Sequence, residues 1–459
     1  MKDLSSHCGH DNQPRLLVIG RLLKVQGNGR REKVAEELKA FARQGFSIDC
    51  VTFDDATPDI FDEYRHFLNG IVQEWHVWKD PFLAVVRFLV RGWHRCRHRN
   101  ASDPGRNRQR PKIRPTNPAN ILLSLPDPNI GWYLFHRKKL IRLVEQKRYT
   151  HLYTLSSPHS IQFTGYYIKK HYPELKWIAS FRDPWSAYPL QYPGSWVSSF
   201  NRHAEQRCLQ ACDQAVIYRG WMPGGRQTFV HLYGEKLAGK IVEAPYIGCD
   251  EKEIDHILEN YDESGLSRGN RLHFVHLGTL YGYDHTPVPF LKALQEYLER
   301  YVNVDIEIQV TFLGGITADA EKVIRANKLL KEHVNVEQYL PYEEAVVRVA
   351  NSHVALWFQA KHSHFSENIP AKVFEYVYLG LPVMSISTTK DCIRLLEENG
   401  LGWTFMAENT EGIVKAINEL AHRRERGEVL RIRGIQPFPR RHFVHWFEQM
   451  VVKPAVSDK

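Results

Sequence analysis

The chain has 459 residues, enough for two or three domains, and its apolar share of 43% and charged share of 25% are ordinary globular values. They exclude a largely disordered chain, and no apolar run approaches the roughly 20 residues that a membrane-spanning helix needs. The seven cysteines form no CxxC pair, and residues 1–14 are polar. We therefore expect a cytoplasmic protein with reduced cysteines and no secretory signal.

The positive charge of the chain, +9 in total, is concentrated in one segment. Between Arg87 and Arg114 stand ten lysines and arginines and a single acid, Asp103. Residues 81–99 combine an apolar stripe with arginines at helical spacing, so the segment 81–114 suits an anionic membrane surface, such as the inner face of the plasma membrane. A solvated loop is the alternative. Nucleic acid is not expected as a partner, because no recognition motif accompanies the charge.

Short apolar runs alternate with helical patterns through the first half of the chain. A glycine turn at 26–30 leads into a predicted helix over 32–44, and a second helix is expected over 158–170. Residues 54–150 interrupt the rhythm, and we interpret them as an insertion with one or two helices and a loop. The predicted strands are residues 15–20, 47–53, 151–155, 176–181, 214–218 and 240–245.

A second alternating series follows a crossing at 245–250. Its predicted strands are residues 272–277, 305–313, 334–340, 353–358 and 382–387. Its predicted helices are residues 287–300, 317–331, 342–351, 370–379 and 389–398. This rhythm predicts an α/β chain with parallel sheets. We expect one domain over 1–248, a second over 249–438, and a final segment, 439–459, whose helix packs back on the first domain.

The most informative motif is SENIPAKVFEYVYLG, residues 366–380. Pro370 suits the first turn of the predicted helix, because the amide hydrogen that proline lacks has no partner there. Glu367 lies in the loop before this helix and Glu375 lies inside it, so both carboxylates can reach the crevice at the carboxyl ends of the strands. A carboxylate there can accept both ribose hydroxyls, and the amides of a helix N-terminus favour phosphate oxygens.

These two glutamates, seven residues apart and followed by Leu-Gly-Leu-Pro-Val, resemble the E-x7-E signature of retaining family 4 glycosyltransferases. The resemblance implies the GT-B fold, two Rossmann-like domains that face each other across a cleft. It also implies that Glu367 contacts the donor sugar and that Glu375 holds the nucleotide ribose. The stretches LSSPHS (155–160) and WIASFRDPW (177–185) resemble a bacterial branch of the family, although Ser180 stands where that branch usually has aspartate.

Further site residues follow from the turns. The turn LGTL, with Gly278 and Thr279, resembles the one that opens the second domain of these enzymes, and the first glycine loop, with Gly29, resembles their loop near the donor phosphates. For the diphosphate we expect the amides at Ile369 and the first glycine loop, with Lys372. Arg182 is an alternative cation and His285 a weaker one. On the acceptor side, Asp183 and His159 are the candidates.

The resemblance implies a hexosyltransferase of bacterial surface polysaccharide or lipopolysaccharide synthesis, acting on a lipid-linked or oligosaccharide acceptor with retention of configuration. UDP is the first expectation for the donor nucleotide and GDP the second. No D-x-D occurs, so we expect neither a metal nor another cofactor. Two alternatives stay open: a non-catalytic partner protein with the same fold, and an enzyme similar to the UDP-N-acetylglucosamine 2-epimerases.

Overall fold

The chain divides into two compact units, each built on a parallel sheet. Unit 1 comprises residues 1–218, 226–244 and 444–459, and unit 2 comprises 219–225 and 245–443. The computed structural model describes residues 13–22, 29–54, 61–62, 65, 68, 70–81, 125–183, 185–186, 196–219, 225–259, 270–280, 286–301, 305–338, 340–358, 369–386, 390–432 and 439–457.

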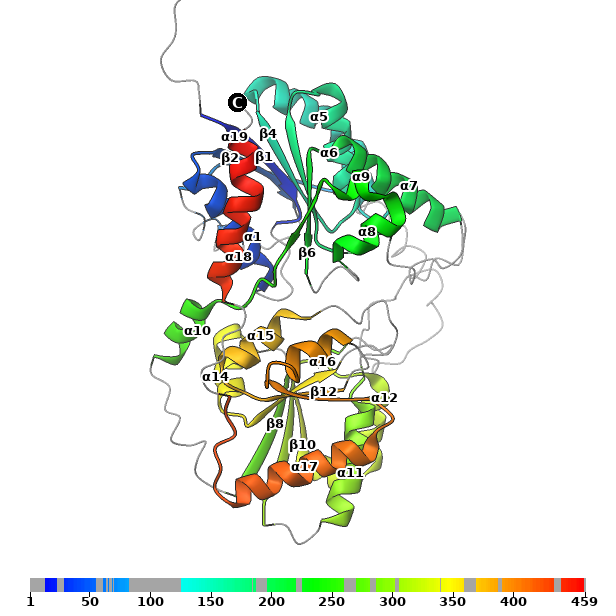
Figure 1. Cartoon of the computed structure of the whole chain (residues 1–459), viewed down its shortest axis with the longest axis vertical. Helices are drawn as coiled ribbons and strands as arrows, with labels where there is room; N and C mark the ends of the chain where they lie inside the picture. The colour runs from blue at the N-terminus through cyan, green and yellow to red at the C-terminus, as the bar shows by residue number, and fades with distance from the viewer. Residues whose placement is uncertain are drawn as a thin grey trace, which may run out of the picture. The chain divides into compact units, whose positions relative to one another are not determined.

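Unit 1 has a seven-stranded sheet in the order β3-β2-β1-β4-β5-β6-β7, and every neighbouring pair is parallel. Its strands are β1 Arg15–Gly20, β2 Ser47–Phe53, β3 Val72–Trp78, β4 His151–Ser156, β5 Lys176–Phe181, β6 Gln214–Tyr218 and β7 Ile241–Ala244. Its helices are α1 Gly29–Arg43, α5 Ile130–Lys147, α6 Ser160–His171, α7 Trp196–Ala211, α8 Gly225–Tyr233 and α9 Glu235–Ala238. Helix α1 lies on one side of the sheet, and α5 to α9 lie on the other (Figure 1).

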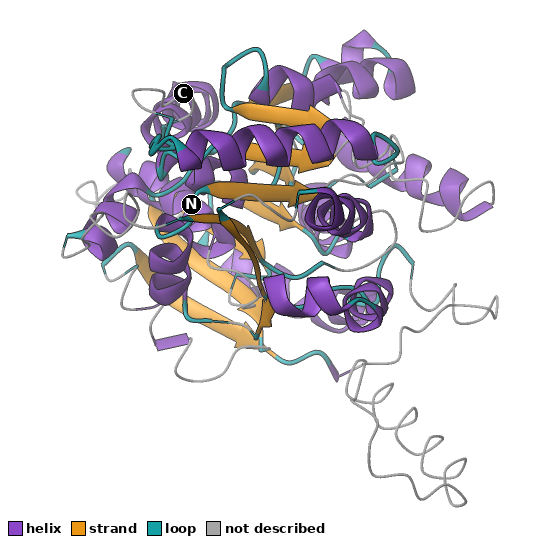
Figure 2. Ribbon diagram, turned by 90° about the horizontal axis from the view of Figure 1, so that it is seen from below, coloured by secondary structure: helices purple, strands orange, loops and turns teal. Residues whose placement is uncertain are grey.

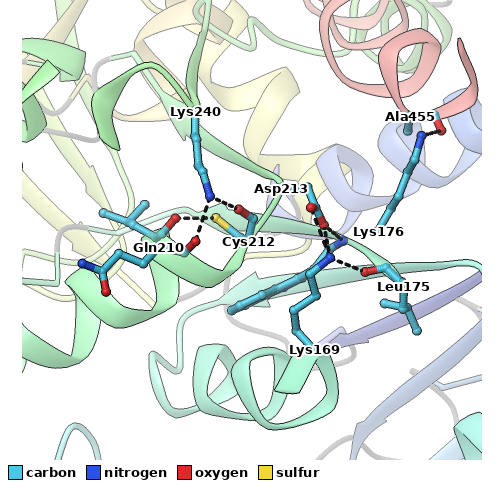
Figure 3. A network of polar contacts seen from close by, with 10 residues as sticks. Lys169, Leu175, Lys176, Gln210, Cys212, Asp213, Lys240 and Ala455 are labelled. Atoms are coloured by element: carbon cyan, nitrogen blue, oxygen red, sulfur yellow. Dashed lines mark hydrogen bonds and ion pairs between the residues drawn. The ribbon is translucent and has the colours of Figure 1, made fainter. Parts of the chain in front are cut away.

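The end of the chain completes the α1 side of unit 1. Helix α18 (Arg440–Phe447) continues into the π-helical turn η2 (Glu448–Val452) and the short helix α19 (Lys453–Ser457), so the helix expected in the segment 439–459 is interrupted after Phe447. The ring of Phe447 lies 5.6 Å from that of Phe41 on α1. Lys176 donates to the Ala455 carbonyl at 3.2 Å, as Figure 3 shows beside the network that closes the end of α7.

Unit 2 has a six-stranded parallel sheet in the order β10-β9-β8-β11-β12-β13. Its strands are β8 Arg271–Leu277, β9 Glu307–Leu313, β10 Val334–Glu337, β11 Val354–Phe358, β12 Val383–Ile386 and β13 Gly402–Phe405. Its helices are α10 Glu251–Leu258, α11 Val288–Arg300, α12 Ala318–Ala326, α13 Lys328–His333, α14 Tyr342–Ala350, α15 Ala371–Tyr378, α16 Lys390–Leu396 and α17 Thr410–Glu425. Separate apolar clusters cover its two faces, so helices flank the strands (Figure 2).

Three expectations about elements need correction. Strand β3 pairs with β2, and α5 packs on α6, so these parts of 54–150 belong to the regular unit and are not an insertion. The helix expected over 317–331 is two helices, because Asn327 adopts extended backbone and its side chain caps α13 by accepting from the Leu330 amide. The edge strand β13 was not expected from its four residues.

Candidate functional site

In both sheets the strand order reverses beside the first strand, at the β1/β4 boundary in unit 1 and the β8/β11 boundary in unit 2. The loops that leave two neighbouring strands there run to opposite faces and leave a crevice, in which open α/β sheets bind ligands. Sequence-predicted residues follow the strands at both points, with His159 after β4, and Gly278 and Thr279 after β8.

The loops after β8 and β9 in unit 2 are joined through their backbones. The Gly278 amide donates to the Leu313 carbonyl at 2.7 Å, and the Leu280 amide donates to the Gly315 carbonyl at 2.8 Å. A Cβ atom on Gly314 would lie only 2.9 Å from the Gly278 carbonyl carbon, and Gly314 has a φ of +125°. We did not expect Gly314 and Gly315 in this site, although a Gly-Gly pair directly after a strand could have indicated it.

Helix α15 packs against the end of β8. Ile369, Val373, Tyr376 and Val377 are buried, and the Tyr376 hydroxyl accepts from the Leu277 amide at 2.8 Å, which ties the helix to the end of β8. Pro370 has extended backbone, with a ψ of 149°, so it precedes the helix and does not occupy its first turn. The helix therefore begins at Ala371 and presents its N-terminal amides beside the β8 loop.

Lys372, in the first turn of α15, places a cation beside the end of β8. Its ammonium donates to the Leu277 carbonyl at 2.8 Å and lies 3.1 Å from Nε2 of His276. Burial lowers the pKa of Lys372 to about 7, and the neighbouring Glu375 carboxylate opposes this shift. A cation fixed in the first turn of a helix, beside a glycine turn, is suited to bind an anionic ligand such as a diphosphate.

Of the two signature glutamates, Glu375 lies within the described residues. Glu375 is half-buried on α15, and the Tyr342 hydroxyl lies 3.5 Å from its Oε1 atom. Glu367 lies outside the described residues, as do His285 and the basic segment from residue 82 onward. Gly29 is the first residue of α1, and the glycine loop before it also lies outside the described residues.

In unit 1 the two acceptor-side candidates follow neighbouring strands, His159 after β4 and Asp183 after β5. Ser157 donates to the Asp183 carboxylate at 2.6 Å. The His159 ring stacks on Trp185, with 5.3 Å between ring centroids and an interplanar angle of 7°. We did not expect Ser157 and Trp185 as partners of these residues. The Ser157 hydroxyl, in the Ser-Ser-Pro-His-Ser stretch directly after β4, could have indicated a polar partner for Asp183.

Arg182 does not join that group. Its side chain is buried and forms an ion pair with Glu37 of α1, a residue that is also buried. Tyr153 and Tyr218 donate to the same carboxylate at 3.0 and 2.7 Å, so the pair belongs to a hydrogen-bonded network inside unit 1. The charge of Arg182 is therefore balanced by Glu37 inside unit 1, and its contacts are structural.

Within the described residues, no cluster of histidine, cysteine, aspartate and glutamate side chains has the geometry of a metal site. No helix within those same ranges has the length and apolar character for crossing a membrane.

No protein-family model and no curated protein matches the sequence. Solved structures do match. Sucrose-phosphate synthase from Thermosynechococcus elongatus aligns with 97% of this chain and 100% of its own, at a TM-score of 0.55 and 13% identity. The chain has the GT-B fold.

Two further structures agree. The Escherichia coli trehalose-6-phosphate protein bound with UDP-2-fluoro glucose aligns with 95% of this chain and 99% of its own, at a TM-score of 0.57 and 12% identity. The UDP-GlcNAc 2-epimerase from Neisseria meningitidis bound to UDP-GlcNAc aligns with 97% and 100%, at a TM-score of 0.52 and 11% identity. The prediction of two Rossmann-like domains is thereby confirmed.

Proposed function

We propose that this GT-B-fold chain is a glycosyltransferase that uses a nucleotide-sugar donor. The observation that carries the proposal is the Lys372 ammonium, fixed at the end of β8 between the Leu277 carbonyl and His276, beside the N-terminus of α15. Cation and helix amides together match the diphosphate of such a donor. Two structures with the same fold carry UDP-sugars, which supports this ligand class.

In the proposed reaction, the acceptor hydroxyl oxygen bonds to the anomeric carbon while the bond from that carbon to the diphosphate oxygen breaks. The nucleoside diphosphate leaves and the hydroxyl proton is released. Lys372 and the α15 amides stabilise the charge on the departing diphosphate. Glu375 accepts hydrogen bonds from the ribose, and Glu367 contacts the sugar.

The acceptor side of the proposal rests on unit 1. Asp183, oriented by Ser157, and His159, held by Trp185, orient the acceptor hydroxyl for attack. We further propose a lipid-linked or oligosaccharide acceptor, retention at the anomeric carbon, and catalysis without a metal. Peripheral attachment to an anionic membrane through 81–114 and a role in surface polysaccharide synthesis belong to the same proposal.

The direct test is a thermal-shift panel of UDP, GDP, ADP and dTDP with their common sugars, first without metal and then with Mg²⁺. A ligand present at about 100 times its dissociation constant adds about 2.7 kcal/mol of stability. We expect one nucleotide class to stabilise the wild type without metal and to lose this effect in Glu375→Ala. Absence of any shift in folded protein would instead favour a non-catalytic partner protein.

A 2-epimerase is the second candidate function, since enzymes of that name share the fold. Both candidates bind a nucleotide-sugar, so the panel does not separate them. Product analysis does, because a transferase releases the nucleoside diphosphate and an epimerase returns an intact donor with a changed sugar.

A further inference from the structure

His276 is a fully buried histidine on β8, one residue before the strand ends. Its Nδ1 atom lies 2.9 Å from the Leu356 carbonyl oxygen on β11, the neighbouring strand across the switch point. A carbonyl oxygen only accepts, so Nδ1 carries the hydrogen and donates it. In the neutral ring the Nε2 atom then carries a lone pair that can accept a hydrogen bond, and this is the atom that lies 3.1 Å from the Lys372 ammonium.

The ammonium of Lys372 is therefore fixed by two acceptors. One is Nε2 of His276, and the other is the Leu277 carbonyl oxygen at 2.8 Å. An ammonium has three hydrogens, and the contacts within the described residues use two of them, so the third can serve a ligand. A Cβ atom at Gly278 would lie 3.7 Å from Nζ, which places the ammonium directly beside the glycine turn.

We propose that His276 is the positioning residue that holds the Lys372 ammonium in place for the diphosphate of the donor. The inference rests on the proposed function, because it assigns a role within the same site. The bond from Nδ1 to the Leu356 carbonyl fixes the orientation of the His276 ring, and the ring then holds the Lys372 ammonium through Nε2. It does not touch the ligand, and the ring contacts with Phe312 and Phe358 keep it between apolar neighbours.

Two described groups near Lys372 do not supply this acceptor. Glu375 acts on Lys372 through its charge, and the Tyr376 hydroxyl accepts from the Leu277 amide. Without His276, the Leu277 carbonyl would be the one fixed acceptor left to the lysine among the described residues. Its ammonium would then sample several positions and bind a diphosphate more weakly, since preorganisation is lost.

Two substitutions at His276 separate positioning from packing. Asparagine places an amide nitrogen where Nδ1 stands, so His276→Asn can keep the bond to Leu356 while losing the acceptor for Lys372. Glutamine places its amide near Nε2, so His276→Gln can keep the acceptor for Lys372. His273→Asn is the matched control, because His273 lies on the same strand and contacts Thr311 and Ser352 instead.

The experiment is isothermal titration of inorganic pyrophosphate, and of the nucleoside diphosphate selected by the panel, into the wild type and these variants. We expect both probes to bind about tenfold more weakly to His276→Asn, because this variant loses a charge-assisted hydrogen bond. Binding to His276→Gln and to His273→Asn should be near normal. The corresponding nucleoside without phosphate should bind all four proteins equally.

The outcomes separate the two proposals. If the nucleoside diphosphate binds His276→Asn as tightly as wild type, the role of His276 is wrong while the proposed function stands. If pyrophosphate binding depends on His276 but no nucleotide binds, the role of His276 stands and the proposed function falls. If neither probe binds the wild type, both are overturned.

Discussion

At the residue scale, Lys372 combines a fixed position with an altered proton affinity. Burial lowers its pKa to about 7 from 10.5, while Glu375 opposes the shift. The ammonium is therefore charged below pH 7 and loses its proton as the pH rises through that value. Anion binding favours the charged form, so the ligand and the proton assist each other.

We predict that affinity for the nucleoside diphosphate falls by up to about tenfold per pH unit above pH 7, because each binding event must then take up a proton. Titration calorimetry between pH 7 and 9 measures this slope. Lys372→Met should bind weakly at every pH and show no slope. An unchanged affinity across this range in the wild type would contradict the role of Lys372.

The same group predicts a stability trend in the ligand-free protein. Between pH 7 and 10.5 the unfolded chain holds a proton on Lys372 that the folded chain lacks. The contribution of Lys372 to the free energy of unfolding therefore rises with pH in this window. In denaturant unfolding, the free energy of unfolding of the wild type minus that of Lys372→Met should increase from pH 7 to pH 10.5. A difference that is constant over this range would refute the prediction.

Glu37 and Arg182 form the buried ion pair of unit 1, and removal of one partner leaves the other charge uncompensated. We predict that Glu37→Gln lowers the free energy of unfolding by about 3 kcal/mol. Glu235→Gln is the matched control, because the Glu235 side chain is 72% exposed in its pair with Arg226, and should cost less than about 1 kcal/mol. Equal losses in the two variants would argue against the pair as a structural anchor.

At the element scale, the last segment of the chain acts as a covering layer for unit 1. Phe447 is fully buried, and its ring meets those of Phe41 and Tyr153. We predict that Phe447→Ala destabilises unit 1 by about 3–5 kcal/mol, since it removes a large ring from a packed core. Hydrogen exchange should show loss of protection in β1 and β4.

The control for Phe447 lies on the same segment. Met450 is 44% exposed, so Met450→Ala should leave exchange in unit 1 nearly unchanged. Protection in the strands of unit 2 should persist in both variants. If Phe447→Ala loosened neither β1 nor β4, the end of the chain would not be part of the unit 1 core.

The loops after β8 and β9 in unit 2 pass close to each other at Gly278 and Gly314. In Gly314→Ala, the new Cβ atom would meet the Gly278 carbonyl carbon at 2.9 Å, so one of the two loops must move. We predict at least tenfold weaker nucleotide binding in this variant. Gly400→Ala, which also has a positive φ but open space around it, should lose stability without losing affinity. Comparable affinity in both variants would separate the glycine loops from the donor site.

Much of the element pattern could be predicted because buried parallel strands are short apolar runs, as in RLLVIG of β1 and KWIASF of β5. Strand β3 could not, since its sequence VQEWHVW is half exposed at the edge of the sheet and lacks an apolar run. The break between α12 and α13 at Asn327 could not be predicted either. An asparagine that caps a helix cannot be told from one inside a helix when the apolar spacing continues on both sides.

The site was predictable only as far as local motifs reach. Lys372 and Glu375 stand in one helix, and their spacing is visible in the sequence. His276, Ser157 and Trp185 enter through contacts between segments that are far apart in the sequence. One example is the contact between the His276 ring on β8 and the Lys372 ammonium in the first turn of α15. Arg182 looked like a free cation in FRDPW, and only the structure shows that Glu37, far away along the chain, neutralises it.

At the scale of the whole molecule, two parallel sheets that reverse their strand order at β1/β4 and β8/β11 give the chain two candidate ligand crevices. The solved structures that share this fold include proteins of more than one activity, as their names show. The fold therefore does not decide the function, which depends on the groups in the two crevices. The proposed function assigns this role to Lys372 and Glu375 in unit 2 and to Asp183 and His159 in unit 1.

The most direct test of the glycosyltransferase account is ³¹P and ¹H NMR of the stabilising nucleotide-sugar, incubated with wild-type protein or Glu375→Ala and with an oligosaccharide acceptor mixture. The account predicts release of the nucleoside diphosphate together with a new anomeric signal of retained configuration, and loss of both in the variant. An intact donor whose sugar is epimerised at C2, or a donor that binds and stays unchanged with every acceptor, would contradict it.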